Sequence, residues 1–167
     1  KDSVHGGASV ANDAMTVGCK DCHGTHDIRA RDDFESQTFS LNLPQTCLKC
    51  HGEKVHNARG GAFVQLYEKS AHFMALEKAG LTLSANCSNC HGAHDIKTVK
   101  NPLSRVSRNN IIKTCGQCHV GIQRDYLEGV HGKDYVKEIK DVPVCTDCHS
   151  EHDIRSPKDL ESKVYAT

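Results

Sequence analysis

One short cysteine motif occurs five times in the sequence, and this repetition constrains the fold more than any other feature. All ten cysteines of the 167-residue chain belong to C-x-x-C pairs, and a histidine directly follows each pair. Two thiols one helical turn apart can reach the two vinyl groups of one porphyrin, and the next side chain then points its imidazole at the iron. The spacing therefore predicts five covalently attached haem c groups, each with one axial histidine. The motifs, numbered first to fifth, are Cys19, Cys22 and His23; Cys47, Cys50 and His51; Cys87, Cys90 and His91; Cys115, Cys118 and His119; and Cys145, Cys148 and His149.

Three other uses of paired cysteines explain the pattern less well. A zinc ribbon takes two C-x-x-C pairs per metal, so five pairs would leave one over, and the following histidine would have no role. A disulfide framework would scatter its cysteines through the chain. A thioredoxin-like enzyme carries a single motif on a βαβ unit, and no βαβ pattern is visible in this sequence.

The composition agrees with a core that porphyrins supply. Leu, Ile, Val and Phe number 34, about 20% of the chain, and Trp is absent, which lies at the border of what a charged chain needs to fold. The 21 basic and 21 acidic residues balance, so no nucleic-acid partner is expected. No stretch approaches the ~20 apolar residues of a membrane span, and the N-terminal residues lack the layout of a signal peptide. We therefore expect a mature, soluble chain.

Seven further histidines are candidates for the sixth iron ligands. Methionine occurs only twice, so we expect bis-histidine ligation at all five irons and potentials in the lower part of the haem range. These candidates are His5, His26, His56, His72, His94, His131 and His152.

The shortest connections along the chain predict how these histidines pair with the motifs. They give His5 to the first motif, His72 to the third and His131 to the fifth. A histidine three residues beyond an axial ligand cannot easily reach the opposite face of the same iron, so His26 is given to the second motif and His94 to the fourth. His56 and His152 are then left over, and either is a candidate ligand for a haem of an adjacent subunit.

The motifs belong to an internal repeat. Residues 23–28, 91–96 and 149–154 are near copies with the pattern H-x-x-H-D-I, and Cys19 to Cys47 spans 28 residues, as does Cys87 to Cys115. The repeat predicts a single multihaem domain made of two haem-pair units and a half unit. Their ranges are 1–57, 58–121 and 122–167.

Regular structure is expected to be sparse. Apolar spacing predicts one helix from about Ala62 to Lys78, closed by Gly80, and another from about Val120 to Val130. The rest reads as loops and turns, so the expected fold is mostly irregular with short α-helices around haem groups and little or no β-structure. The aspartates of the three repeats, Asp27, Asp95 and Asp153, are expected either to accept a hydrogen bond from the preceding histidine or simply to cap a helix or close a turn.

With these motifs, the chain resembles multihaem c-type cytochromes of anaerobic respiration, including class III cytochromes, and extracellular cytochromes of metal-reducing bacteria. The resemblance rests on the five C-x-x-C-H motifs, on the H-G-x-H-D-I segments and on S-x-H segments at residues 3–5 and 70–72, so it covers essentially the whole chain. It implies electron transfer between closely spaced bis-histidine haems and haem attachment outside the cytoplasm. Some relatives form conducting extracellular filaments, so the expected partners are other redox proteins or copies of the chain itself, with haem ligation between subunits.

Two classes of function are compatible with these motifs. The first is electron transfer without catalysis, either as a periplasmic carrier or as an extracellular conduit such as a filament subunit. The second is a multihaem reductase of nitrite, sulfite or hydroxylamine, which needs one iron with an open position for substrate. The chain has enough histidines to close every site, so we expect an electron-transfer protein and assign no catalytic residue.

Overall fold

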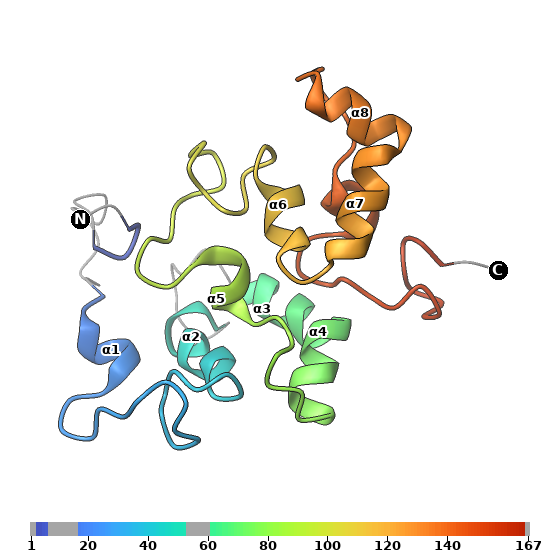
Figure 1. The fold of residues 1–167 in the computed structure, drawn as a ribbon. Helices are drawn as coiled ribbons and strands as arrows, with labels where there is room; N and C mark the ends of the chain where they lie inside the picture. The colour runs from blue at the N-terminus through green and yellow to red at the C-terminus, as the bar shows by residue number, and fades with distance from the viewer. Residues whose placement is uncertain (1–2, 7–16, 53–60, 166–167) are drawn as a thin grey trace.

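The computed structural model describes residues 3–6, 17–52 and 61–165 as a series of short helices joined by irregular chain (Figure 1). The N-terminal helix α1 lies at one end of the molecule, and helices α7 and α8 lie at the other. The described ranges contain no β-strand, so the expected fold class is confirmed. The helices are α1 (Cys19–His23), α2 (Leu43–His51), α3 (Gly61–Glu68), α4 (Ala71–Phe73), the π-helical turn η2 (Met74–Lys78), α5 (Cys87–His91), α6 (Ile111–Gly116), α7 (Val120–Glu128), α8 (Val130–Val136) and α9 (Cys145–His149).

The first, third and fifth motifs each form an isolated one-turn helix, namely α1, α5 and α9. In each, the side chain before the second cysteine accepts a hydrogen bond from the backbone N–H of the residue that precedes the helix. This cap satisfies a backbone donor that so short a helix leaves without a partner. The three bonds are Gly18 N to Asp21 Oδ2 at 2.7 Å, Asn86 N to Asn89 Oδ1 at 2.9 Å and Val144 N to Asp147 Oδ2 at 2.7 Å.

The second and fourth motifs lie differently, because each is attached to a longer helix. The second motif forms the C-terminal end of α2, and the fourth begins in α6 and ends at His119, which caps α7. The structure thus separates the motifs into two kinds, which alternate along the chain.

Each of the two expected helices is broken before its histidine. Ser70 lies in an extended conformation, and its hydroxyl accepts a hydrogen bond from Phe73 N at 3.1 Å, so a new helix starts there. Gly129 is also extended and separates α7 from α8. Gly80, with φ of +65°, follows the end of η2 as expected. The breaks place His72 and His131 in the first turn of a new helix.

The connectors between motifs fold as successive tight turns. In the first two units, an asparagine amide donates to two carbonyls of the preceding turns, from Asn42 to Phe34 and Ser36, and from Asn110 to Pro102 and Ser104. These four bonds of 2.8–2.9 Å hold each connector in a fixed shape without a strand or a long helix.

The polypeptide buries few large apolar side chains. Among the residues that the structure describes, the buried hydrophobic ones are Leu76, Ile111, Ile112, Val142 and Val144, whereas fifteen large hydrophobic side chains are exposed. The accessible surface is 11799 Å², compared with about 8,100 Å² for a compact folded protein of this mass. The chain therefore presents apolar surface that a large apolar group could cover.

Candidate haem-attachment sites

Four of the five motif histidines face a second imidazole across a gap of constant width. In each pair the ring centroids are 6.0 Å apart. Two imidazole nitrogens bound to opposite sides of one metal, each about 2 Å from it, place the ring centroids about 6 Å apart. The residues present therefore fit bis-histidine haem. The pairs are His23 with His94, His51 with His5, His91 with His152 and His119 with His72.

The four ring pairs fall into two classes that follow the two kinds of motif. The rings of the first and third motifs are nearly parallel to their partners, at 14° and 10°. The rings of the second and fourth motifs are tilted, at 43° and 55°. The partners differ as well. Each parallel pair uses a histidine from the H-x-x-H-D-I loop of the next unit. Each tilted pair uses the histidine that lies upstream of both motifs of the same unit.

This pairing corrects the one expected from sequence. His5 faces the second motif instead of the first, His72 faces the fourth instead of the third, and His94 faces the first instead of the fourth. His152, which the sequence left without an iron in its own chain, faces His91. The expectation was wrong because it joined histidines to the nearest motif along the chain, whereas the H-x-x-H-D-I loops of the second and third units each fold back onto the unit before them.

Backbone hydrogen bonds fix the position of these loops. The carbonyl of Ile96 accepts from the N–H of Val4, and the carbonyl of Ile154 accepts from the N–H of Ala71, both at 2.8 Å. Val4 and Ala71 each precede a ligand candidate, His5 and His72. Each of these contacts therefore positions two histidines, the loop histidine of a parallel pair and the helix histidine of a tilted pair.

The thiols of successive motifs lie close to one another along the whole series. The Cys47 and Cys87 thiols share a hydrogen bond that raises the pKa of Cys47, and the Cys115 and Cys145 thiols share another that raises the pKa of Cys115. After burial, the strongest influence on the pKa of Cys22 is the nearby Cys47, and both raise it. For Cys90, burial and then Cys118 raise the pKa. Each motif is therefore next to the one that follows it.

Burial favours the neutral form of the paired imidazoles. It is the largest cause that lowers the pKa of His5, His72, His91 and His152, and a facing histidine lowers the first three further. A histidine must be neutral to bind a metal. The sites therefore favour the ligand form of these side chains.

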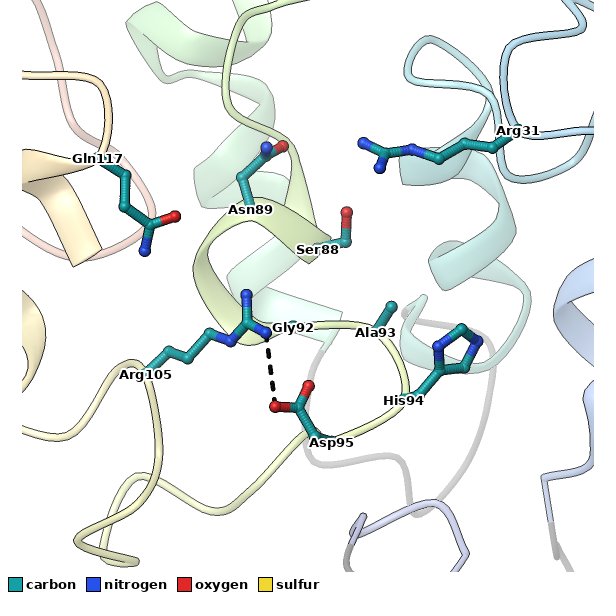
Figure 2. A pocket seen from close by; sticks show the side chains of 9 residues that line it. All are labelled: Arg31, Ser88, Asn89, Gly92, Ala93, His94, Asp95, Arg105 and Gln117. Atoms are coloured by element: carbon teal, nitrogen blue, oxygen red, sulfur yellow. Dashed lines mark hydrogen bonds and ion pairs between the residues drawn. The ribbon is translucent and has the colours of Figure 1, made fainter.

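A polar cavity of about 280 Å³ borders His94. Figure 2 shows Arg31 and Arg105 reaching into it from opposite sides, with His94 at its edge. Arg105 pairs with Asp95 at 3.5 Å. No hydrogen bond joins Asp95 to His94 within the described ranges, where the partner of the Asp95 carboxylate is Arg105.

Three expected ligands lack a facing imidazole within the described ranges, and one lies outside them. His26, His131 and the motif histidine His149 are exposed, and Nδ1 of His26 lies 3.3 Å from the Thr25 hydroxyl. His56 falls outside the described residues. No group of three or more histidine, cysteine or acidic residues forms a metal site in the described ranges, and no helix there is long and apolar enough to cross a membrane.

The comparison with protein families decides among the classes of paired-cysteine protein. The model of the family described as cytochrome c3 matches residues 11–120, which include the first four motifs. The chain belongs to the cytochrome c3 family. This cytochrome is therefore a multihaem electron-transfer protein with covalently bound haem c, of a family typical of compartments outside the cytoplasm. Comparisons with curated proteins and with solved structures gave no match.

Proposed function

We propose that this cytochrome binds five haem c groups and conducts electrons along its length, from motif to motif. The observation that carries the proposal is the order of the sites. Thiols of consecutive motifs are neighbours from the first to the fifth, and the four facing imidazole pairs are the right distance apart for bis-histidine ligation. Sites this close need no moving part to pass an electron.

The chain determines where each haem group would be held and which side chains would bind its iron. When bound, the haem groups supply reversible one-electron chemistry at iron. The paired cysteines of each motif would hold one group, and the facing histidines would exclude exchangeable ligands from four of the sites. Arg31 and Arg105, on two sides of the polar cavity beside His94, provide positive charge for the carboxylates that a porphyrin carries.

Mass spectrometry and electron paramagnetic resonance of the holoprotein test the proposal. We expect the mass of the chain plus five haems and low-spin bis-histidine signals from the four internal pairs. Fewer than five haems, or high-spin iron at an internal pair, would contradict it.

The exposed fifth motif supports a second candidate function. His149 has no facing imidazole in the described ranges, so an iron there could keep a position for substrate, as in a multihaem reductase of nitrite, sulfite or hydroxylamine. Reduction of one of these substrates with multiple turnovers, inhibited by carbon monoxide, would favour the reductase. Slow, non-specific oxidation of the reduced protein would favour the conduit.

The proposed electron transfer is compatible with two cellular roles, a periplasmic carrier and an extracellular conduit. The partners are other redox proteins for the first and copies of the chain for the second. Cell fractionation distinguishes them, since a carrier is released with the periplasm and an extracellular conduit is recovered from the cell surface or medium.

A further inference from the structure

Arg155 carries a buried N–H group that has no hydrogen-bond partner among the described residues. Its side chain is only 15% exposed, and its Nε is the buried atom without a partner. A buried donor of a charged group is costly to leave unpaired, and native proteins rarely do so. The Nε–H of Arg155 therefore indicates a further acceptor at this position.

The two acidic residues that pair with Arg155 lie on the other edge of its guanidinium. Asp159 Oδ2 is 3.3 Å from Nη1, and Glu161 Oε2 is 2.5 Å from the same nitrogen. A guanidinium is planar and binds a carboxylate best through two parallel N–H groups along one edge. The edge that includes Nε–H is therefore suited to a further carboxylate, while the other edge is held by the acidic pair.

Arg155 lies next to residues of two haem-attachment sites. It follows His152, which belongs to the site of the third motif, by three positions. It also directly follows Ile154, whose carbonyl accepts a hydrogen bond from the N–H of Ala71 at 2.8 Å. Ala71 in turn precedes His72, which belongs to the site of the fourth motif. A haem bound at either site would bring its carboxylates to this part of the molecule.

Arg29 is the equivalent residue of the first unit, and its surroundings differ. It pairs with the two equivalent acidic residues, Asp33 at 3.1 Å and Glu35 at 2.6 Å, which are closest to Nη1 and Nη2 respectively. Its side chain is 44% exposed. The sequence pattern of one arginine and two acidic residues thus does not by itself bury the arginine or place both acids on one edge.

We propose that Arg155 binds a propionate carboxylate of haem through the edge that carries its Nε–H. The ligand is a propionate of the haem attached at the third or the fourth motif, so the inference rests on the proposed haem sites. Asp159 and Glu161 hold the guanidinium in one orientation. The positive charge of Arg155 beside the propionate favours the reduced state of that haem, because reduction adds a negative charge to the group.

Methionine substitutions at the two equivalent arginines test the inference. Arg155→Met removes the charge and the Nε–H but retains a side chain of similar length, and Arg29→Met is the matched control. We expect Arg155→Met to retain its haems, to lower the reduction potential of one internal haem and to shift the propionate bands of the resonance Raman spectrum. Arg29→Met should leave the internal potentials and these bands unchanged.

Electron paramagnetic resonance during the redox titration identifies the haem that changes. The facing rings are 10° apart at the third site and 55° apart at the fourth, and the low-spin signal of a bis-histidine haem depends on this angle. A lower potential in the nearly parallel class assigns the propionate to the third haem. A lower potential in the tilted class assigns it to the fourth, and either result supports the proposal.

Arg155→Lys separates the hydrogen bond from the charge. Lysine keeps the positive charge but lacks the planar pair of N–H groups. We expect a smaller fall in potential than in Arg155→Met, with the propionate bands still shifted from those of the wild type.

Three results would overturn the inference. The first is Arg155→Met with wild-type potentials and propionate bands, which would assign the burial of Arg155 to packing alone. The second is an equal change in Arg29→Met, and the third is Arg155→Lys with unshifted propionate bands. All three leave the wild-type haem content and low-spin signals intact, whereas failure of the proposed function would appear in the wild type as missing haems or high-spin iron at the internal pairs.

Discussion

Helices α5 and α9 are the same element in two surroundings. Both are five-residue helices with a capped N-terminus, and both end in a motif histidine. His91 at the end of α5 is half-buried and faces His152 at 6.0 Å, whereas His149 at the end of α9 is exposed. The motif sequence alone therefore does not supply the second imidazole that closes the site. Closure depends on the loop of the next unit.

This difference shows that a unit of the repeat is not self-sufficient. Each first motif takes its second imidazole and its cover from the unit that follows, as neighbouring repeats of a solenoid complete one another's core. In the described ranges the fifth motif is formed as fully as the third, but no imidazole faces His149.

The largest expected effect comes from removing the attachment cysteines at each helix. The double variant Cys87→Ala, Cys90→Ala empties a site covered on both faces, because α5 packs against α2 and faces the loop of His152. The double variant Cys145→Ala, Cys148→Ala empties a site with one open face. We expect the first to lower the free energy of unfolding by about 3 kcal/mol more than the second, because it leaves the larger cavity. Denaturant unfolding of both holoproteins checks this, and equal losses would contradict the comparison.

Replacement of the facing histidine should convert α5 into a copy of α9. His152→Ala removes the imidazole opposite His91, so the third haem should become high-spin and bind carbon monoxide after reduction. The other internal pairs should keep their low-spin signals, since their partners are different residues. A spectrum of His152→Ala identical to the wild type would mean that another ligand serves the third motif.

The residue that follows the motif histidine differs between α5 and α9. Exchanging glycine for a residue with a side chain, or the reverse, tests the backbone conformation at this position. Gly92 follows α5 with φ of +81°, and Ser150 follows α9 with φ of +70°, a conformation that favours glycine. Gly92→Ala should destabilise the protein by about 1–3 kcal/mol, since its Cβ would also meet Asp95 Oδ1 at 2.5 Å. Ser150→Gly should stabilise it by about 1 kcal/mol. Thermal unfolding measures both, and a loss of stability in Ser150→Gly would contradict the comparison.

The smallest effect concerns an ion pair that only α9 has. Arg108 donates to both oxygens of Asp147 at 3.0 and 2.9 Å and to the carbonyl of Val142 at 2.7 Å. The corresponding residue of α5 is Asn89, which is uncharged. Because the pair is largely exposed, Arg108→Ala should cost only about 0.5–1 kcal/mol. The loss should shrink at high salt, and a salt-independent loss would assign it to packing.

The haem-attachment residues and the fold class could be predicted from the sequence, because both follow from the C-x-x-C-H motif and the composition. Cysteine spacing predicts haem attachment, and the shortage of large apolar residues predicts a fold of short helices without strands. The capping role of Asp21 and Asp147 was also visible in principle, since an acidic residue precedes the second cysteine in both motifs.

The imidazole pairing could not be predicted in the same way, because distance along the chain is a poor guide to the partner of a loop that folds back. His94 is three residues from His91 and faces His23, 71 positions away. The signal that could have found this pairing is the repeat itself. His152, left over at the end of the series, shows that the loop histidines are shifted by one unit relative to the motifs.

The arrangement of axial ligands in the holoprotein tests the central claim most directly. A holoprotein structure determined by crystallography or electron cryomicroscopy would show which imidazole binds each iron. We predict His94 opposite His23 and His152 opposite His91, with His5 and His72 opposite His51 and His119. His5 bound opposite His23, or His72 opposite His91, would contradict the account.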